Sequence, residues 1–243
     1  MFKHRGKSRT FRHNFRLAAF LSFTAGMVNI CGVLSLGVLT TNVTGHFAYF
    51  AEGALKKDAL DSVYFLFYIL AFLFGSFISN LLTELFTNKQ RVSPHSAAMF
   101  LEIFMLLIVG IWGDAFISAG VSKPFIACIL LFAMGVQNSL VSKISNSTVR
   151  TTHLTGLFTD LGIELSQLFF YKEENERRQL WHSIGLRGSI IAFFFSGCVA
   201  GGFLYSGLRF KILLLAVVTL IIALMYDNIR LSYYRIKRLG FRN

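Results

Sequence analysis

The sequence predicts an all-α integral membrane protein: a helical bundle of two homologous halves, with six full spans and two short helices that carry a repeated motif. Three observations predict this class. The mean hydropathy is +0.59, and 54% of the 243 residues are hydrophobic, which is too apolar for a soluble domain of this size. Several apolar stretches approach or exceed the roughly 20 residues that a helix needs to cross a bilayer. An eight-residue phrase also occurs twice, which indicates an internal duplication.

The repeated phrase reads TTNVTGHF at residues 40–47 and TTHLTGLF at residues 151–158, with five identities in eight positions. Each copy follows an apolar segment that carries an asparagine, Asn29 before the first and Asn138 before the second. Duplicated membrane proteins commonly build their functional site at the interface between the repeats. We therefore expect the two phrases to meet near a pseudo-symmetry axis.

The first half is expected over residues 17–120, after a basic segment at residues 1–16. Its spans are predicted at about 15–39, 62–86 and 94–112, with a joint between the halves at 113–123. After the first phrase, about fourteen weakly apolar residues lead to Lys56, which is short for a full crossing.

The second half is expected over residues 121–229, before a basic tail at 230–243. Its spans are predicted at about 124–144, 184–205 and 210–226, with a helix from the second phrase to about Phe170 and a solvated loop at 171–182. If the two phrase-bearing segments cross the membrane, there are eight spans and parallel repeats. If they do not, there are six spans and inverted repeats, and both topologies leave the two termini on the same side.

The net charge of +12 is concentrated near the ends of the chain. The terminal basic residues are Lys3, Arg5, Lys7, Arg9, Arg12 and Arg16 before the first span, and Arg230, Arg235, Lys237, Arg238 and Arg242 after the last. Flanking positive charge is typical of cytoplasmic segments, so both termini are predicted to be cytoplasmic. Membrane lipids with anionic headgroups are the expected partners, and nucleic acid is not.

The phrases supply candidate substrate-binding residues. Threonine at a helix start can cap free backbone N–H groups, and helix starts near Thr41 and Thr152 would direct two positive dipole ends at an anionic group. The alternative is that the phrase only packs two helices closely. The candidate substrate-binding residues are Asn29, Thr41, Thr44, Gly45, His46, Asn138, Thr152, Thr155 and Gly156.

Three carboxylates are candidates for coupling a proton or cation to transport: Glu52, Asp160 and Glu164. A carboxylate in hydrocarbon is costly unless it is paired, protonated or hydrated, so an intramembrane carboxylate points to function by default. The alternative is that these three lie near enough to the surface to be solvated. Glu102 lies within a predicted span and is expected to pair internally.

The sequence lacks the usual catalytic motifs, with no Walker loop, nucleophile elbow or metalloprotease pattern. Its three cysteines are expected to be small packing residues, and neither His46 nor His153 has metal-ligand spacing. We therefore expect no cofactor, no metal and no enzymatic activity. The favoured function is a permease or secondary transporter for a small molecule, anionic ones included. The alternatives are a membrane scaffold or partner subunit and, less favoured, a lipid-modifying enzyme, and homo-oligomerisation is left open.

The paired phrases, with Gly135-x-Gln137-Asn138 upstream of the second, resemble the YoaK family of bacterial membrane proteins, also called domain of unknown function 1275. The resemblance covers almost the whole chain. The first phrase departs from the family pattern because His46 follows Gly45 where the family has asparagine. The resemblance implies a multi-pass protein of the bacterial inner membrane, and it implies no established substrate or reaction.

Overall fold

The computed structural model describes residues 11–56, 59–87 and 94–225, and all regular structure in that part of the chain is helical. The helices are α1 (Phe11–Leu36), α2 (Val43–Leu55), α3 (Ala59–Thr87), α4 (Pro94–Ser118), α5 (Lys123–Ser145), α6 (Leu154–Gln167) and α7 (Glu174–Leu208), followed by the 3₁₀ turn η2 (Arg209–Lys211) and a helical segment at 212–225. The all-α prediction is confirmed. The predicted basic ends lie mostly outside the described residues.

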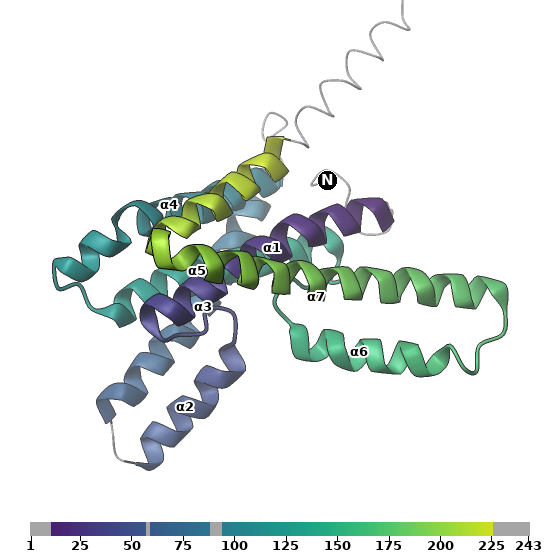
Figure 1. The fold of residues 1–243 in the computed structure, drawn as a ribbon, viewed down its shortest axis with the longest axis horizontal. Coiled ribbons are helices and arrows are strands. Elements are labelled where there is room, and N and C mark those ends of the chain that lie inside the picture. The colour runs from purple at the N-terminus through teal and green to yellow at the C-terminus, as the bar shows by residue number, and fades with distance from the viewer. Residues whose placement is uncertain (1–10, 57–58, 88–93, 226–243) are drawn as a thin grey trace, which may run out of the picture.

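Five stretches of the described chain are long and apolar enough to cross a membrane. They are Asn14–Leu36, Ser62–Thr87, His95–Ser118, Lys123–Ser145 and Glu174–Met225. The fifth stretch contains a break at Arg209, whose φ of +45° ends α7 and turns the chain back (Figure 1). The protein is therefore a multi-span membrane protein, with an additional reversal inside its last apolar stretch.

The two phrase-bearing helices are not among these five stretches. α2 has 13 residues and α6 has 14. At 1.5 Å per residue each is about 20 Å long, whereas the hydrocarbon core of a bilayer is about 30 Å thick. Neither helix is long enough to cross a membrane alone.

Two predicted boundaries are wrong. α4 continues to Ser118, so residues 119–122 connect it to α5, whereas the predicted joint covered 113–123. α7 begins at Glu174, so most of the predicted loop at 171–182 is helical, although its side chains are largely exposed. Charged residues are good helix formers, and the two glutamates in the first turn of α7 interact favourably with the positive end of the helix dipole. A polar segment can therefore be helical, and the polarity of residues 171–182 was not sufficient to predict a loop.

α1 and α7 cross with their backbones in contact. A Cβ at Gly26 would lie 2.1 Å from the carbonyl oxygen of Phe194, and a Cβ at Gly197 would lie 2.1 Å from that of Phe23. Only glycine fits at these two positions, because any side chain would push the helices apart. The two helices run in the same direction (Figure 1).

α3 and α5 cross in the same way. A Cβ at Gly75 would lie 2.1 Å from the carbonyl oxygen of Phe132, and a Cβ at Gly135 would lie 2.1 Å from that of Phe72. The first helix of each predicted half therefore packs against the third helix of the other half.

A side-chain hydrogen bond accompanies each crossing. The Ser76 hydroxyl on α3 donates to the carbonyl oxygen of Gly135 at 3.1 Å. The Cys198 thiol on α7 donates to the carbonyl oxygen of Gly26 at 3.3 Å. Cys198 thus occupies a helix contact, which is the packing role predicted for it.

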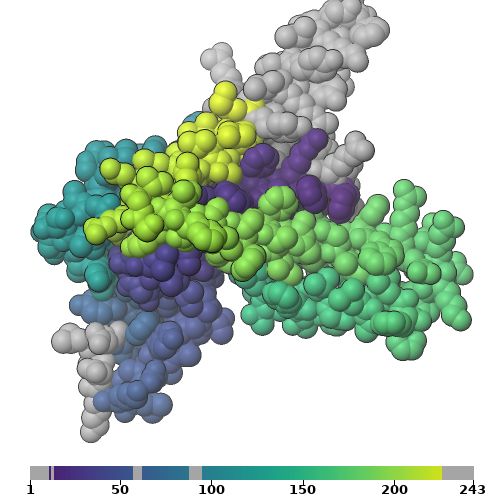
Figure 2. All heavy atoms as spheres, in the orientation of Figure 1, coloured from purple at the N-terminus to yellow at the C-terminus, as the bar shows by residue number. Residues whose placement is uncertain are grey.

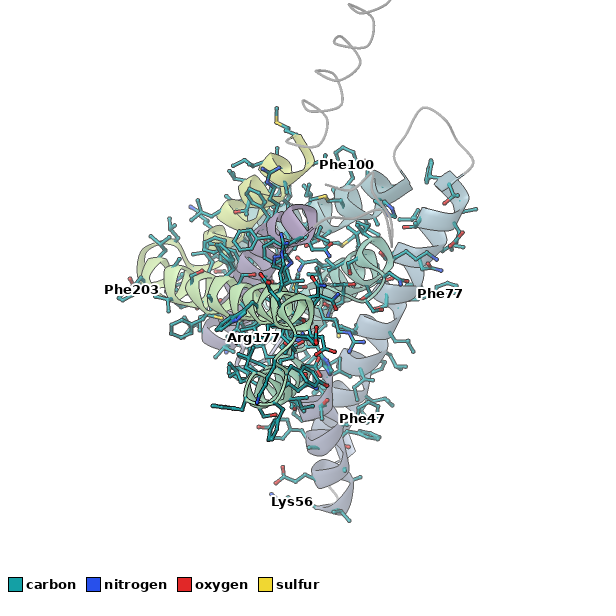
Figure 3. The ribbon with its side chains drawn as sticks, turned by 90° about the vertical axis from the view of Figure 1, so that its right-hand side faces the viewer. Phe47, Lys56, Phe77, Phe100, Arg177 and Phe203 are labelled. Carbon is teal, nitrogen blue, oxygen red and sulfur yellow. The ribbon has the colours of Figure 1, made fainter. Side chains whose placement is uncertain are left out.

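α1 and α5 form the centre of the bundle, because they are the most buried of the five apolar stretches. α4 packs against η2, where Gly113 lies close to the side chain of Phe210. Phe77, Phe100 and Phe203 point outward from the bundle, as expected for side chains that face lipid (Figure 3). α2 with the first part of α3, and α6 with the first part of α7, project from the bundle as two separate hairpins (Figure 2).

Candidate functional site

The first phrase is hydrogen-bonded to the asparagine that precedes it, and we call this contact between Thr41 and Asn29 the first clasp. The Thr41 hydroxyl donates to Asn29 Oδ1 at 3.0 Å. Gly37, with a φ of +74°, lets the chain turn between α1 and the phrase. Asn42 then caps α2, because its Oδ1 accepts a hydrogen bond from the backbone N–H of Gly45 at 3.0 Å.

The second phrase closes in the same manner, in what we call the second clasp. Asn138 Oδ1 accepts hydrogen bonds from the hydroxyls of Thr152 at 2.8 Å and Thr151 at 3.4 Å. The neighbouring Gln137 donates from Nε2 to Thr151 Oγ1 at 3.2 Å and to the carbonyl oxygen of Leu21 at 2.9 Å. Gln137 therefore ties the second clasp to the middle of α1.

The two clasps do not form one site, and the expectation that the phrases meet is corrected. Gln137 joins the second clasp to Leu21, eight residues before Asn29, which places the first clasp about 12 Å farther along α1. α2 packs against α3, and α6 packs against α7. Figure 2 shows open space between the two hairpins. Each asparagine accepts hydrogen bonds from the phrase that follows it 12 to 14 residues later in the chain. The contacts of each phrase are therefore local, and the two phrases do not contact each other through them.

His46 is buried in an aromatic contact with α3. Its Nε2 lies 2.8 Å from the carbonyl oxygen of Leu39, and its ring lies 5.2 Å from that of Tyr68 and 6.0 Å from that of Phe65. Burial lowers the pKa of His46, against the opposing effect of the Leu39 carbonyl. A neutral imidazole in this position anchors α2 to α3, which is a packing role.

The remaining phrase residues form the helix starts. Thr44 and Thr155 are exposed on α2 and α6. A Cβ at Gly45 would lie 2.9 Å from the side chain of Asn42, and a Cβ at Gly156 would lie 2.6 Å from the ring of His153. Both glycines therefore make room for the side chain of the residue that precedes their helix.

Asp160 and Glu164 are paired with a residue that the sequence reasoning missed. Arg187 on α7 donates from Nη2 to Asp160 Oδ2 at 3.2 Å, and its Nη1 binds both Glu164 and Ser183. Arg187 is about a quarter exposed and Glu164 about an eighth. The one signal in the sequence was an isolated arginine within an otherwise apolar segment.

Glu52 does not join this group. Its carboxylate lies 2.5 Å from Lys56 Nζ on the exposed surface of the same helix. Such a pair contributes about 0.3–0.5 kcal/mol. The three predicted coupling carboxylates are thus divided between two hairpins, with charged partners in both.

Glu102 is fully buried, and neither of its carboxyl oxygens has a hydrogen-bond partner. The expectation that it pairs internally is wrong for the described part of the chain. Other polar groups in the spans are also buried without a partner, namely the hydroxyls of Ser22, Thr24 and Ser79 and the amide oxygen of Gln137. No cluster of three or more metal-ligating side chains occurs among the residues that the structure describes.

Comparison with known proteins places the chain in a family. A family model described as "Protein of unknown function (DUF1275)" matches residues 17–226. The chain is 27% identical over 161 residues to the UPF0700 transmembrane protein YoaK of Bacillus subtilis (strain 168), which covers 66% of this chain and 71% of that protein. No solved structure matches. The chain therefore belongs to the DUF1275 family.

Proposed function

We propose that this protein is a small-molecule permease or secondary transporter built from two repeats of opposite orientation. The observation that carries the proposal is the reciprocal packing of the halves, in which α1 crosses α7 and α5 crosses α3 through paired glycines in backbone contact. Transporters built from inverted repeats work by moving one group of helices against another around a site near the middle of the bilayer. Close glycine contacts provide surfaces on which helices can pivot.

Matched residues support the duplication. Phe23, Gly26 and Asn29 each precede their counterparts Phe132, Gly135 and Asn138 by 109 positions. Phe72, Gly75 and Ser76 each precede Phe194, Gly197 and Cys198 by 122 positions. Members of both sets make the same contacts at the two crossings. Independent packing of unrelated helices would not produce the same residue types at both.

An inverted topology with six spans fits these contacts. α2 and α6 are too short to cross, and α1 begins on the right of Figure 1 whereas α5 begins on the left. With a cytoplasmic N-terminus, the first clasp and α2 lie toward the outer face, and the second clasp and α6 lie toward the cytoplasm. The clasps then stand on opposite sides of the bilayer centre, where an alternating-access carrier needs its two gates.

The unpartnered polar groups within the spans favour a transporter over a scaffold. Buried polar groups in a membrane protein normally find a hydrogen-bond partner, since an unsatisfied one is costly in hydrocarbon. In the described part of the chain, the hydroxyls of Ser22 and Ser79 and the amide oxygen of Gln137 are buried without partners. In a scaffold whose packing never changes, these groups would be destabilising with no function to offset the cost. A carrier uses such groups to bind a polar substrate during part of its cycle.

The topology is tested by labelling single cysteines in intact cells. In a background without the native cysteines, Lys56→Cys should react with a membrane-impermeant thiol reagent from outside, and Ser147→Cys should react only after the cells are opened. Eight spans and parallel repeats would reverse both results, which makes the two positions controls for each other.

Transport is tested in liposomes that contain the purified full chain and a panel of labelled small metabolites, anionic and neutral. The cysteine pairs Asn29→Cys/Thr41→Cys and Asn138→Cys/Thr152→Cys should each lose uptake when a short thiol cross-linker holds a clasp closed. Thr159→Cys, on an exposed residue of α6 outside both clasps, is the matched control. Unchanged uptake in both cross-linked pairs would show that the clasps are not gates.

A further inference from the structure

We propose that Glu102 is the proton-binding site of this protein, and that the transported substrate is coupled to the proton that Glu102 carries. The coupling rests on the proposed transport function, whereas the proton site itself rests only on the surroundings of the side chain. Neither Glu102 nor α4 belongs to the two clasps.

Glu102 is closed off from solvent. Glu102 lies eight residues after the start of α4 at Pro94, which places it about 12 Å from that end of the helix. On the same face of α4, Met99 and Leu106 are fully buried, and His95, two turns toward the start of the helix, is nearly so. Both carboxyl oxygens are closed off from solvent and have no hydrogen-bond donor among the residues that the structure describes.

Such surroundings hold a neutral carboxylic acid. A charged carboxylate in hydrocarbon requires a cation, several N–H donors or water, and Glu102 has none of the protein groups among the described residues. No group of three or more histidine, cysteine, aspartate or glutamate side chains that could hold a metal ion occurs in the described ranges, and Glu102 therefore has no second side chain of this kind with which to share one. The proton is the one cation that a lone carboxyl group can hold without further ligands.

The charged and titratable groups on the elements packed against α4 do not neutralise Glu102. Among the described side chains they are Tyr64, Tyr68 and Glu84 on α3, Lys123, Cys128 and Lys143 on α5, Arg209 and Lys211 at η2, and His95 and Asp114 on α4 itself. Lys143 binds Glu84 at 2.7 Å, and Arg209 lies 4.0 Å from Asp114 near the opposite end of α4. None of these groups is hydrogen-bonded to either oxygen of Glu102.

The position of Glu102 connects it to the second clasp. α4 and α5 are consecutive helices that pack against each other, joined by residues 119–122. Glu102 lies 16 residues before the end of α4 at Ser118, and residue 139 lies 16 residues after the start of α5 at Lys123. Glu102 is therefore at about the level of Asn138. A movement of α5 that opens the second clasp would admit water to this level and allow the proton to leave.

The protonation state is tested by infrared difference spectroscopy of the full chain in lipid vesicles. At neutral pH the wild type should show the C=O stretch of a protonated carboxylic acid, and Glu102→Gln should lack it. Glu84→Gln, which alters an exposed ion-paired carboxylate, should retain the band. Absence of the band in the wild type, or its persistence in Glu102→Gln, would overturn the proton site. If Glu102→Gln does not fold, Glu102→Asp should keep the band with a shifted frequency, and an unshifted band would count against the assignment.

Coupling is tested separately, so that its failure can be told from failure of transport. In vesicles with a pH-sensitive dye inside, addition of a transported compound should move protons with the wild type, and Glu102→Gln should abolish this movement while substrate exchange continues. Proton movement that persists in Glu102→Gln would overturn the coupling. An infrared band assigned to Glu102 in a protein that transports no compound would leave the proton site standing and remove the transport proposal.

Discussion

The α2–α3 and α6–α7 hairpins begin with the same phrase and develop differently after it. In both, a threonine closes on an asparagine of the preceding span. Beyond the clasp, α2 docks on α3 through the buried ring of His46, whereas α6 docks on α7 through the ion pairs of Arg187. The difference shows that the clasp is the shared element, and that each hairpin has acquired its own means of holding the short helix.

The largest expected effect tests whether the two halves are equivalent at their crossings. Gly26→Ala and Gly135→Ala each place a Cβ 2.1 Å from a carbonyl oxygen of the partner helix. Each should destabilise the protein by about 3 kcal/mol or more, because the backbones must separate. Thermal unfolding in detergent measures the effect. Gly188→Ala, where a Cβ meets nothing within 4 Å, is the control and should be neutral or stabilising. A large loss of stability in only one of the two variants would show that the α1–α7 and α3–α5 crossings are not equivalent.

The second prediction concerns the ion pairs that only the α6–α7 hairpin has. Arg187→Gln leaves Asp160 and Glu164 without their cation and should cost about 1–2 kcal/mol, less than a fully buried pair because Asp160 is half exposed. Lys56→Gln, which removes the exposed partner of Glu52 in the other hairpin, should cost about 0.5 kcal/mol or less. Hydrogen exchange of the α6 amides in Arg187→Gln and of the α2 amides in Lys56→Gln measures the two effects, and equal effects in the two hairpins would contradict the prediction.

The third prediction compares the clasps themselves. Asn138→Ala removes the acceptor for two hydroxyls, whereas Asn29→Ala removes the acceptor for one. Each lost hydrogen bond should cost about 1 kcal/mol, so Asn138→Ala should be the more destabilising by about that amount. Double-mutant cycles with Thr152→Val and Thr41→Val isolate the two couplings. Zero coupling at both clasps would mean that the phrases are held by other contacts.

The smallest expected effect is a pH dependence confined to the α2–α3 hairpin. Because burial lowers the pKa of His46 in the folded protein below 6.5, the unfolded state binds the proton more readily. Docking of α2 is therefore fully stable above about pH 6.5 and weakens as the pH falls below that value. Hydrogen exchange of α2 at neutral and mildly acidic pH measures the change. His46→Phe should remove the dependence, and α6, which has Leu157 at this position, should not show it.

The local features of the fold could be predicted from the sequence. Hydropathy located the long apolar segments, although it predicted six separate spans where the last two form one apolar stretch, and the threonine and glycine pattern located the starts of α2 and α6. Of the candidate site residues, Asn29 with Thr41 and Asn138 with Thr152 were brought together as pairs. These contacts span 12 and 14 residues, a separation at which the chain itself limits the possible partners.

Long-range partners could not be predicted in this way. Arg187 lies 23 residues from Glu164 and 27 from Asp160, and the thiol of Cys198 bonds to a carbonyl 172 residues away. No periodicity in the sequence relates these positions, because they come together only when α7 packs against α6 and α1. The same packing gave Glu102 no hydrogen-bond partner within the described part of the chain, although the sequence had predicted that it pairs internally.

The sequence alone determined that the chain is a membrane protein of helices, where its apolar segments lie, and that one phrase is used twice. Hydropathy, helix capping and short loops are local properties, so a run of neighbouring residues is enough to specify them. The tertiary structure alone decided that α1 pairs with α7 and α5 with α3, that the two clasps stand about 12 Å apart along α1, and that Glu102 is fully buried. Those outcomes depend on which helix surfaces fit together, and glycines far apart in the chain set that fit by allowing backbones to touch.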